Sequence, residues 1–169
     1  MSRAKAAAGS LVFLLVAPGV AAGLVPWWLT GWESAGSVPL GVVAIGVALV
    51  AAGVAVLLHA FARFVAEGVG TPAPVAPTQH LVVGGLYRYV RNPMYLAVAA
   101  TIVGQAMILG RPWLALYALA FGGTVAAFVH LYEEPTLARR FGAEYDAYRR
   151  AVPAWWPRRR PWSPGEAPS

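Results

Sequence analysis

Long apolar stretches separated by short polar segments dominate the sequence. Four of them cover residues 11–29, 38–61, 93–109 and 113–132. Each is about 20 residues long, and at a rise of about 1.5 Å per residue such a helix matches a bilayer core about 30 Å thick. The pattern therefore predicts an all-α integral membrane protein with four transmembrane helices. The last two form an antiparallel hairpin with a turn at residues 110–112.

The hydrophobic period changes after the fourth stretch. Leu137, Phe141, Tyr145 and Tyr148 recur at helical spacing, with charged side chains between them. This pattern is typical of an amphipathic helix that lies at the membrane interface or covers one end of the bundle. The WWPRRR stretch at residues 155–160 fits a headgroup anchor, and we expect the tail from residue 161 to be disordered.

Composition supports a lipid environment and excludes several classes of protein. Hydrophobic residues make up 59% of the chain and charged residues only 12%, against about 25% in soluble domains. The residues that carry the net charge of +6 flank the apolar stretches, which suits anionic headgroups better than nucleic acid. The absence of cysteine excludes disulfides and thiolate metal sites, and the three histidines lie too far apart in sequence for a metal-ligand motif.

The distribution of basic residues predicts the orientation. In a four-span topology, 12 of the 13 Lys and Arg residues fall on one side, and Arg111 falls on the other. The positive-inside rule then predicts that both termini and the amphipathic helix lie in the cytoplasm. A cleaved signal peptide, with Arg3 and Lys5 as its positive region, is the alternative for the first stretch. The length of that stretch and the tryptophans at its far end favour a retained span.

Polar residues gather in two segments, residues 79–95 and 133–150. Because a helical hairpin returns to the membrane face on which it starts, the beginning of the third span and the end of the fourth lie at the same face. We therefore expect the two segments to meet and to enclose one pocket. Glycines and prolines at residues 68–77 exclude a long helix just before the first segment.

The first segment has the parts of a site for an anionic group. Gly84-Gly85 allows close approach of the backbone. Asn92 is a predicted N-cap, and the helix that begins at Pro93 offers free N–H groups and a positive dipole end. Arg88 and Arg91 can pair with a carboxylate.

Aromatic and acidic side chains complete the candidate site. Tyr87, Tyr89 and Tyr95 can stack on a ring or hydrogen-bond to it, and Glu133 suits ribose hydroxyls or an ammonium group. Each feature also has a purely structural interpretation, in which the arginines anchor loops, the tyrosines form an interfacial belt and Glu133 is a solvated helix-end carboxylate. The residues alone predict a membrane protein with a polar cytoplasmic pocket.

The order of residues in these segments resembles the isoprenylcysteine carboxyl methyltransferase family. The motifs that carry the resemblance are GTPAP at residues 70–74, LVVGGLYRYVRNPMY at 81–95, EEP at 133–135, FGAEY at 141–145 and VP at 152–153. An isolated RNPxY would be weak evidence, whereas two long motifs that flank a helical hairpin are specific. Phospholipid methyltransferases share much of this pattern, and the chain resembles the bacterial-type members.

The resemblance implies S-adenosylmethionine as methyl donor and a lipophilic small molecule or lipid as acceptor, with no nucleic-acid partner. It also implies a bacterial inner-membrane location. By matching position, the cofactor pocket falls on Gln79, His80, Leu81, Val82, Tyr87, Asn92, Pro93, Met94, Tyr95 and Glu133. The residue-based argument adds Arg88 and Arg91 to this set. Because the donor supplies the reactive group, the protein mainly positions the acceptor and excludes water, and His130 or Tyr95 is the candidate for catalytic assistance.

Two departures from the family pattern bear on the acceptor. Asn92 stands where many members have histidine, and an asparagine can still cap a helix and form hydrogen bonds. Val129, with His130 beside it, stands where eukaryotic prenylcysteine enzymes carry an arginine that contacts the substrate. Because an apolar side chain cannot hold a carboxylate, a prenylcysteine acceptor is disfavoured.

Two other functions stay open on the sequence. They are an NADPH-dependent sterol-type reductase of related membrane fold and a non-enzymatic small membrane protein; the scarcity of charges inside the spans argues against ion transport. We expect an N-terminal transmembrane helix pair at residues 1–66, a methyltransferase-like catalytic region with helices three and four at 67–160, and a disordered tail at 161–169. The oligomeric state stays open.

Overall fold

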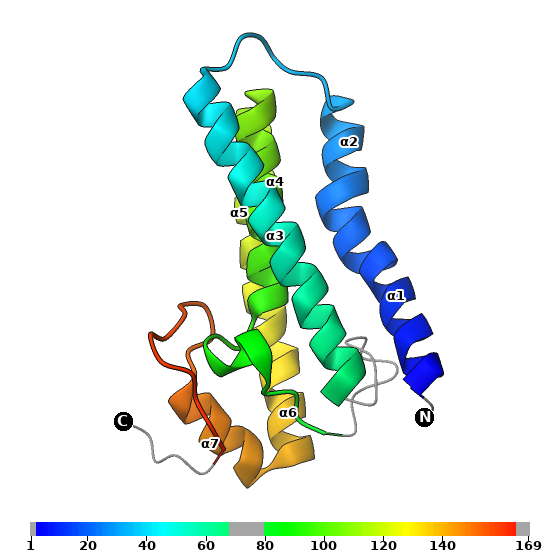
Figure 1. Cartoon of the computed structure of the whole chain (residues 1–169), viewed down its shortest axis with the longest axis vertical. Coiled ribbons are helices and arrows are strands. Elements are labelled where there is room, and N and C mark those ends of the chain that lie inside the picture. The colour runs from blue at the N-terminus through cyan, green and yellow to red at the C-terminus, as the bar shows by residue number, and fades with distance from the viewer. Residues whose placement is uncertain (1–2, 68–79, 165–169) are drawn as a thin grey trace.

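The computed structural model describes residues 3–67 and 80–164, and all regular elements in these ranges are helical (Figure 1). This confirms the all-α prediction. The elements in chain order are α1 (Arg3–Gly19), the π-helical turn η1 (Val20–Leu24), α2 (Val25–Thr30), α3 (Leu40–Glu67), the 3₁₀ turn η2 (Gly85–Arg88), α4 (Pro93–Leu109), α5 (Pro112–Phe128), the π-helical turn η3 (Val129–Glu133), α6 (Glu134–Phe141) and α7 (Ala143–Ala151).

Three of the described helices are long and apolar enough to cross a membrane. They are Val12–Thr30, which joins α1 to α2 through η1, then Leu40–Arg63 in α3, and Pro112–Phe141, which joins α5 to α6 through η3. The helix at Pro93–Leu109, α4, is apolar but shorter. The described residues therefore confirm a membrane protein with three candidate spans, where the sequence predicted four.

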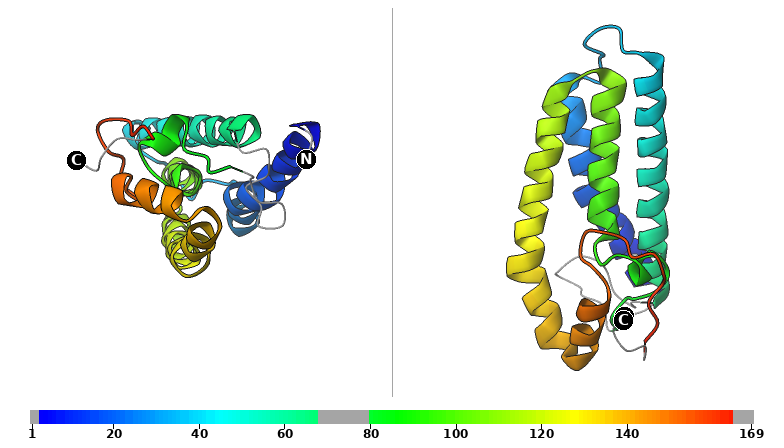
Figure 2. Two further views of the ribbon diagram at one scale, coloured as in Figure 1. Left: turned by 90° about the horizontal axis from the view of Figure 1, so that it is seen from below. Right: turned by 90° about the vertical axis from the view of Figure 1, so that its left-hand side faces the viewer.

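The closest helix packing joins α3 to α4. A Cβ atom at Gly46 would lie 2.7 Å from the carbonyl oxygen of Gly104, and one at Gly104 would lie 2.6 Å from that of Gly46. Only glycine lets the two backbones approach so closely, as in other membrane helix pairs with small residues at the interface. Helices α3, α4 and α5 stand side by side, and α1–η1–α2 runs along the bundle as a separate wall (Figure 2).

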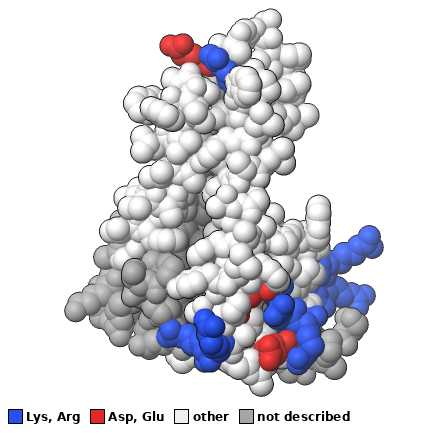
Figure 3. Space-filling view, turned by 180° about the vertical axis from the view of Figure 1, so that it is seen from behind, with Lys and Arg blue, Asp and Glu red and all other residues white. Residues whose placement is uncertain are grey.

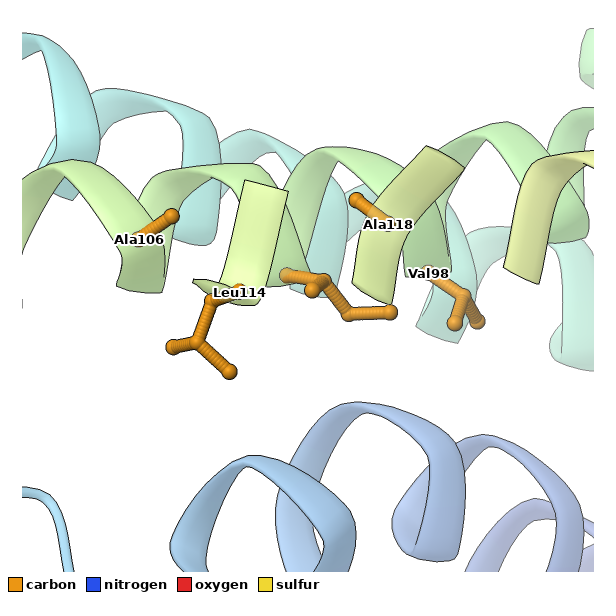
Figure 4. Packing of buried hydrophobic residues seen from close by; sticks show 5 residues of the cluster. Val98, Ala106, Leu114 and Ala118 are labelled. Carbon is orange, nitrogen blue, oxygen red and sulfur yellow. The ribbon is translucent and has the colours of Figure 1, made fainter. Parts of the chain in front are cut away.

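A hydrophobic cluster joins α4 to α5 in the middle of the bundle. Figure 4 shows Val98 and Ala106 on α4 beside Leu114 and Ala118 on α5. The continuous helix α1–η1–α2, which we call the first helix, faces them. Ile102 completes the cluster and is fully buried. Ala21 and Ala22 of η1 and Tyr117 of α5 pack against it, so this cluster fixes the middle of the first helix relative to the hairpin.

The region after η3 differs from the predicted single amphipathic helix. Gly142 has a φ of +52°, which breaks the helix into α6 and α7. The predicted apolar face is nevertheless buried, because Tyr145 and Tyr148 form a cluster with Val152 and Trp162. Trp162 also shows that the structure differs from the expected tail at residues 161–169: it is 4% exposed, and the residues outside the description begin at 165.

Basic side chains gather at one end of the molecule, which we call the basic end and which α6, α7 and residues 152–164 form (Figure 3). At the opposite end, Arg111 donates a hydrogen bond from Nε to the carbonyl oxygen of Glu33, 3.1 Å away. This separation is the one on which the orientation argument depends, and the cytoplasmic location of the basic end stays a prediction.

Candidate functional site

A cavity of about 270 Å³ lies near the basic end, between the first helix, α4 and α5. Its polar end contains Arg91, Asn92, Tyr95 and Glu133. Beside the polar end, Tyr87, Pro93 and Met94 also line the cavity. The rest, which we call the apolar arm, is lined by Phe13, Ala17, Pro18, Ala21, Val98, Phe121, Val125 and Phe128.

The polar end forms where α4 begins and η3 ends. Tyr95 in the first turn of α4 donates a hydrogen bond from its hydroxyl to Oε2 of Glu133, at 3.0 Å. These residues are 38 positions apart in sequence, so the contact confirms that the two polar segments meet. Glu133 closes a π-helical turn, and such turns occur often at functional sites.

Asn92 does not act as the predicted side-chain cap of α4. Its Nδ2 donates instead to the carbonyl oxygen of Ala154, at 3.2 Å, so the amide ties the start of α4 to the chain after α7. The first N–H groups of an α-helix have no intrahelical partner. Without a side-chain cap, those at the start of α4 stay available next to the cavity, to which Asn92 and Pro93 both contribute.

Glu133 and Glu134 are neighbours but have different surroundings. Glu133 lines the cavity, whereas Glu134 is buried in an ion-pair network. Oε1 of Glu134 lies 2.6 Å from Nη1 of Arg91, and Oε2 lies 3.3 Å from Nη2 of Arg149. The side chains of Arg91 and Glu134 are only 12% and 8% exposed, so this network orients Arg91 away from water and against the cavity.

Arg91 lines the cavity and has one donor without a partner among the described residues. Its Nη1 donates to Glu134 and to the hydroxyl of Tyr145, but its Nε is buried and has no hydrogen-bond partner among the described residues. A buried donor without a partner costs free energy, and a ligand that accepts its hydrogen bond removes that cost. Arg91 is thus the residue of this site best suited to an anionic group.

The segment after α7 holds the loop that precedes α4. The backbone N–H of Arg91 donates to the carbonyl oxygen of Pro153 at 2.9 Å, and the N–H of Arg158 donates to that of Tyr89 at 2.9 Å. A third bond runs from the N–H of Trp162 to the carbonyl oxygen of Arg88, at 3.0 Å. The polar end is therefore positioned by chain that lies more than 60 residues away in sequence.

Two buried tyrosines of α7 strengthen this attachment. The hydroxyl of Tyr148 donates to the carbonyl oxygen of Tyr87, at 2.7 Å. Burial raises the pKa of Tyr148 above its ordinary value, and it raises the pKa of Tyr145 against the opposing effect of the nearby Arg91 cation. Both hydroxyls therefore stay protonated and keep donating capacity over the physiological pH range.

The structure brings seven of the predicted cofactor residues to one cavity and places the others elsewhere. Tyr87, Arg91, Asn92, Pro93, Met94, Tyr95 and Glu133 line it. Of the rest, His80 is exposed. Leu81 packs against the Tyr145–Tyr148 cluster, and Val82 packs with Ala60 and Tyr87. Arg88 donates hydrogen bonds to the carbonyl oxygen of Trp162 and to Oγ of Ser163. Gln79 lies outside the described residues.

The two predicted catalytic side chains also separate. Tyr95 lines the cavity, whereas His130 does not. The His130 side chain is 75% exposed, and its Nδ1 lies 3.9 Å from Oε2 of Glu134, which is one helical turn further on. The structure thus places His130 at the surface of the ion-pair network and not against the cavity.

Sequence reasoning missed the apolar arm. Phe13, Ala17 and Ala21 recur every four residues on the first helix, and Phe121, Val125 and Phe128 follow one another at spacings of four and three residues on α5. This spacing defines one face of each helix. In a helix that is apolar all round, however, the spacing does not distinguish the face toward a cavity from the face toward lipid. The ion-pair role of Glu134 was missed because Glu133 and Glu134 are adjacent carboxylates, and the sequence does not distinguish the one that lines the cavity from the one that pairs with arginine.

A comparison with known protein families identifies the group to which the chain belongs. The family model of phospholipid methyltransferases matches residues 42–144, which is more than half of the 169 residues. The chain belongs to the phospholipid methyltransferase family. The match confirms the resemblance seen in the sequence motifs, and it makes this protein a membrane methyltransferase.

For this phospholipid methyltransferase family member, the matched segment includes every residue of the polar end. Phe13, Ala17, Pro18 and Ala21, the part of the apolar arm that the first helix supplies, lie outside it. No curated protein and no solved structure matches the chain. The site therefore combines a polar end that lies inside the family-matched segment with a wall from the first helix, which lies outside that segment.

Proposed function

We propose that this protein transfers a methyl group from S-adenosylmethionine to a lipophilic acceptor, a lipid or a lipophilic small molecule, at the cytoplasmic leaflet. The observation that carries the proposal is the cavity itself. Its polar end joins a carboxylate, a phenol and a buried arginine, and its apolar arm is lined by hydrophobic side chains of the first helix, α4 and α5. A reaction between a polar donor and a lipid needs such a two-sided site.

The residues at the polar end fit the donor. S-adenosylmethionine has a carboxylate, an ammonium group, ribose hydroxyls and an aromatic ring. The Arg91 guanidinium suits the carboxylate, and Glu133 suits the ammonium or the hydroxyls. The cavity volume of 270 Å³ is close to the lower end of the range for ligand sites, about 300 Å³.

When bound, the donor supplies an electrophilic methyl group on a sulfonium. The protein contributes position and a dry environment. Tyr95 is held by its hydrogen bond to Glu133, so its hydroxyl is fixed at the junction between the polar end and the apolar arm. We assign to Tyr95 the orientation of the acceptor's polar group, and we assign no role in catalysis to His130, which lies outside the cavity.

The same proposal gives the topology. Helix α4 lies between α3 and α5 and has 17 residues, which span about 25 Å at 1.5 Å per residue. We propose that it is the fourth span, that α7 and residues 152–164 lie in the cytoplasm, and that both termini are cytoplasmic in a bacterial inner membrane. Residues 67–160 then form the catalytic region, and the N-terminal helix pair supplies one wall of the site.

The test is incubation of the purified protein, reconstituted in nanodiscs, with donor labelled on its methyl group and a bacterial lipid extract. We expect label in a lipid or lipophilic fraction, and none with the Glu133→Ala variant. The matched control is Asp146→Asn, which changes an exposed carboxylate of α7 and should leave labelling unchanged. Thermal stabilisation by NADPH and not by S-adenosylmethionine would favour the reductase alternative and contradict the proposal.

A further inference from the structure

The first helix has an irregular hydrogen-bond pattern in η1, at the end of the apolar arm that lies furthest from the polar end. In η1 the N–H of Val25 bonds to the carbonyl oxygen of Val20, five residues back. This shift, followed by Pro26, which has no N–H, leaves the carbonyl oxygens of Ala21 and Ala22 without their usual α-helical donors. In a lipid environment such groups need another partner, because no water replaces the missing bond.

Two side chains from the hairpin supply these bonds. The hydroxyl of Tyr117 on α5 donates to the carbonyl oxygen of Ala21 at 2.8 Å, and Nε2 of Gln105 on α4 donates to that of Ala22 at 2.7 Å. Both side chains come from helices that also form the cavity. The irregular pattern in η1 therefore fixes the first helix to α4 and α5 at one height in the bundle.

That height is where the cavity ends. Ala21 and Phe121 line the apolar arm and also pack against the cluster of Val98, Ile102 and Leu114. Tyr117 lies one turn before Phe121 in α5, further from the polar end of the cavity. It packs against the same cluster but does not line the cavity. The Tyr117 ring, held by its bond to Ala21, thus stands between the open arm and the closed core.

We infer that Tyr117 is a specificity-determining residue that forms the end wall of a site for the acceptor's hydrocarbon chain. The inference rests on the proposed function, because it assigns the apolar arm to the acceptor. Phe121 and Phe128 on α5 are seven positions apart, which corresponds to about 10 Å of arm, less than the roughly 15 Å of one leaflet. A long chain therefore fills the arm up to Tyr117, and its remainder leaves sideways between α1 and α5.

The first test locates the chain without any need for methyl transfer. The protein is reconstituted in nanodiscs of phosphatidylethanolamine that carries a photoactivatable diazirine on one acyl chain, and the cross-linked residues are mapped by mass spectrometry. We expect label on Phe121, Val125 and Ala17, and none on the buried Leu114. Labelling confined to lipid-facing positions such as Leu119, which is 72% exposed, would overturn the inference.

The second test measures the length of the arm. Single-chain lysophosphatidylethanolamines of increasing acyl length compete with the photolabel at Phe121 and Val125. Competition, expressed per mole of lipid in the nanodisc, should improve with each methylene group that gains packing contacts in the arm, until the chain reaches the end wall and the improvement stops. In Tyr117→Ala the improvement should continue to longer chains, and label should appear on Leu114.

Matched variants separate the wall from general damage to the bundle. Leu116→Ala, at an exposed neighbouring position of α5, should keep the wild-type length limit. Tyr117→Leu keeps an apolar side chain of smaller size, so it should extend the limit less than Tyr117→Ala and serves as the test if the alanine variant does not fold. An unchanged limit in a folded Tyr117 variant would overturn the inference.

Donor binding, measured by calorimetry on the same samples, distinguishes the two proposals. If Phe121 and Val125 are labelled and the length limit depends on Tyr117 but the donor does not bind, the proposed function fails and the chain site stands. If the donor binds and is used but the arm is not labelled, the proposed function stands and the end wall is wrong.

Discussion

The two halves of α4 serve opposite purposes. The half of α4 away from the basic end, which we call its upper half, is closely packed. Gly104 meets Gly46 of α3 backbone to backbone, and Ile102 is fully buried against α5. The lower half of α4 borders the cavity, where polar side chains meet and Arg91 has a donor without a partner among the described residues. A single short helix thus carries both the closely packed seam of the bundle and the start of the cavity's polar end, and the two occupy different parts of the helix.

The largest effect should come from breaking the ion-pair network that supports the lower half. Arg91→Met removes the main partner of the buried Glu134 carboxylate, and loss of one member of a buried pair costs about 3 kcal/mol or more in unfolding free energy. Unfolding of the detergent-solubilised protein measures it. Arg150→Met, at an exposed position of α7, is the control. Equal stability of the two variants would show that Arg149 alone satisfies Glu134.

A smaller loss of stability should follow from forcing α3 and α4 apart at the seam in the upper half. Gly104→Ala places a Cβ atom 2.6 Å from the carbonyl oxygen of Gly46, so the two backbones must separate, at a cost of about 2 kcal/mol. Gly122→Ala, where a Cβ meets nothing within 4 Å, should be neutral or slightly stabilising. If both variants melt at the same temperature, α3 and α4 do not approach as closely as described.

The next effect concerns the cavity and not the fold. Glu133→Gln keeps the size of the side chain but removes its charge, so the affinity for S-adenosylmethionine should fall about tenfold while the melting temperature without ligand stays close to wild type. Isothermal titration calorimetry measures the affinity, with Asp146→Asn as the control. Unchanged affinity would remove Glu133 from the donor site.

The smallest effect should come from the attachment of the loop to α7. Tyr148→Phe removes the hydrogen bond to the carbonyl oxygen of Tyr87, at a cost of about 1 kcal/mol. Because burial raises the pKa of Tyr148 in the folded state, the unfolded state loses this proton first as pH rises. The stability that it contributes is complete below about pH 10 and is lost above it.

Thermal melts between about pH 8 and pH 11 check the sign of this effect, because this range includes the ordinary tyrosine pKa of about 10. The wild type should lose stability toward alkaline pH more steeply than Tyr148→Phe. Parallel curves for the two proteins would mean that another group, such as Tyr145, dominates the alkaline loss.

The sequence predicted the lower half of α4 well for a physical reason. Polar residues are scarce in a membrane helix, so those at 87–95 and at 133 were conspicuous, and the hairpin geometry required them to meet. The hydrogen bond between Tyr95 and Glu133 confirms that meeting. Gly46 packs against Gly104, as small residues in a membrane span often do at helix interfaces.

Other features had no readable signal. Phe13 and Phe121 look like any lipid-facing phenylalanine, so the wall of the cavity could not be separated from the outer surface. The sequence offers His130 beside Tyr95 as a candidate for catalytic assistance, but it does not show that His130 points toward Glu134 and the surface. Trp162 was assigned to a disordered tail because its partners, Arg88 and Tyr148, are distant in sequence.

The three backbone bonds from residues after α7 to the loop before α4 have a consequence for biosynthesis. Ribosomal synthesis delivers the membrane hairpin first, and the acceptors and donors at Pro153, Arg158 and Trp162 emerge only afterwards. Until then the loop lacks the contacts that hold Arg88, Tyr89 and Arg91 in place. The membrane helices can thus insert early, whereas the polar end of the cavity takes its final shape only after residues 153–162 have been made.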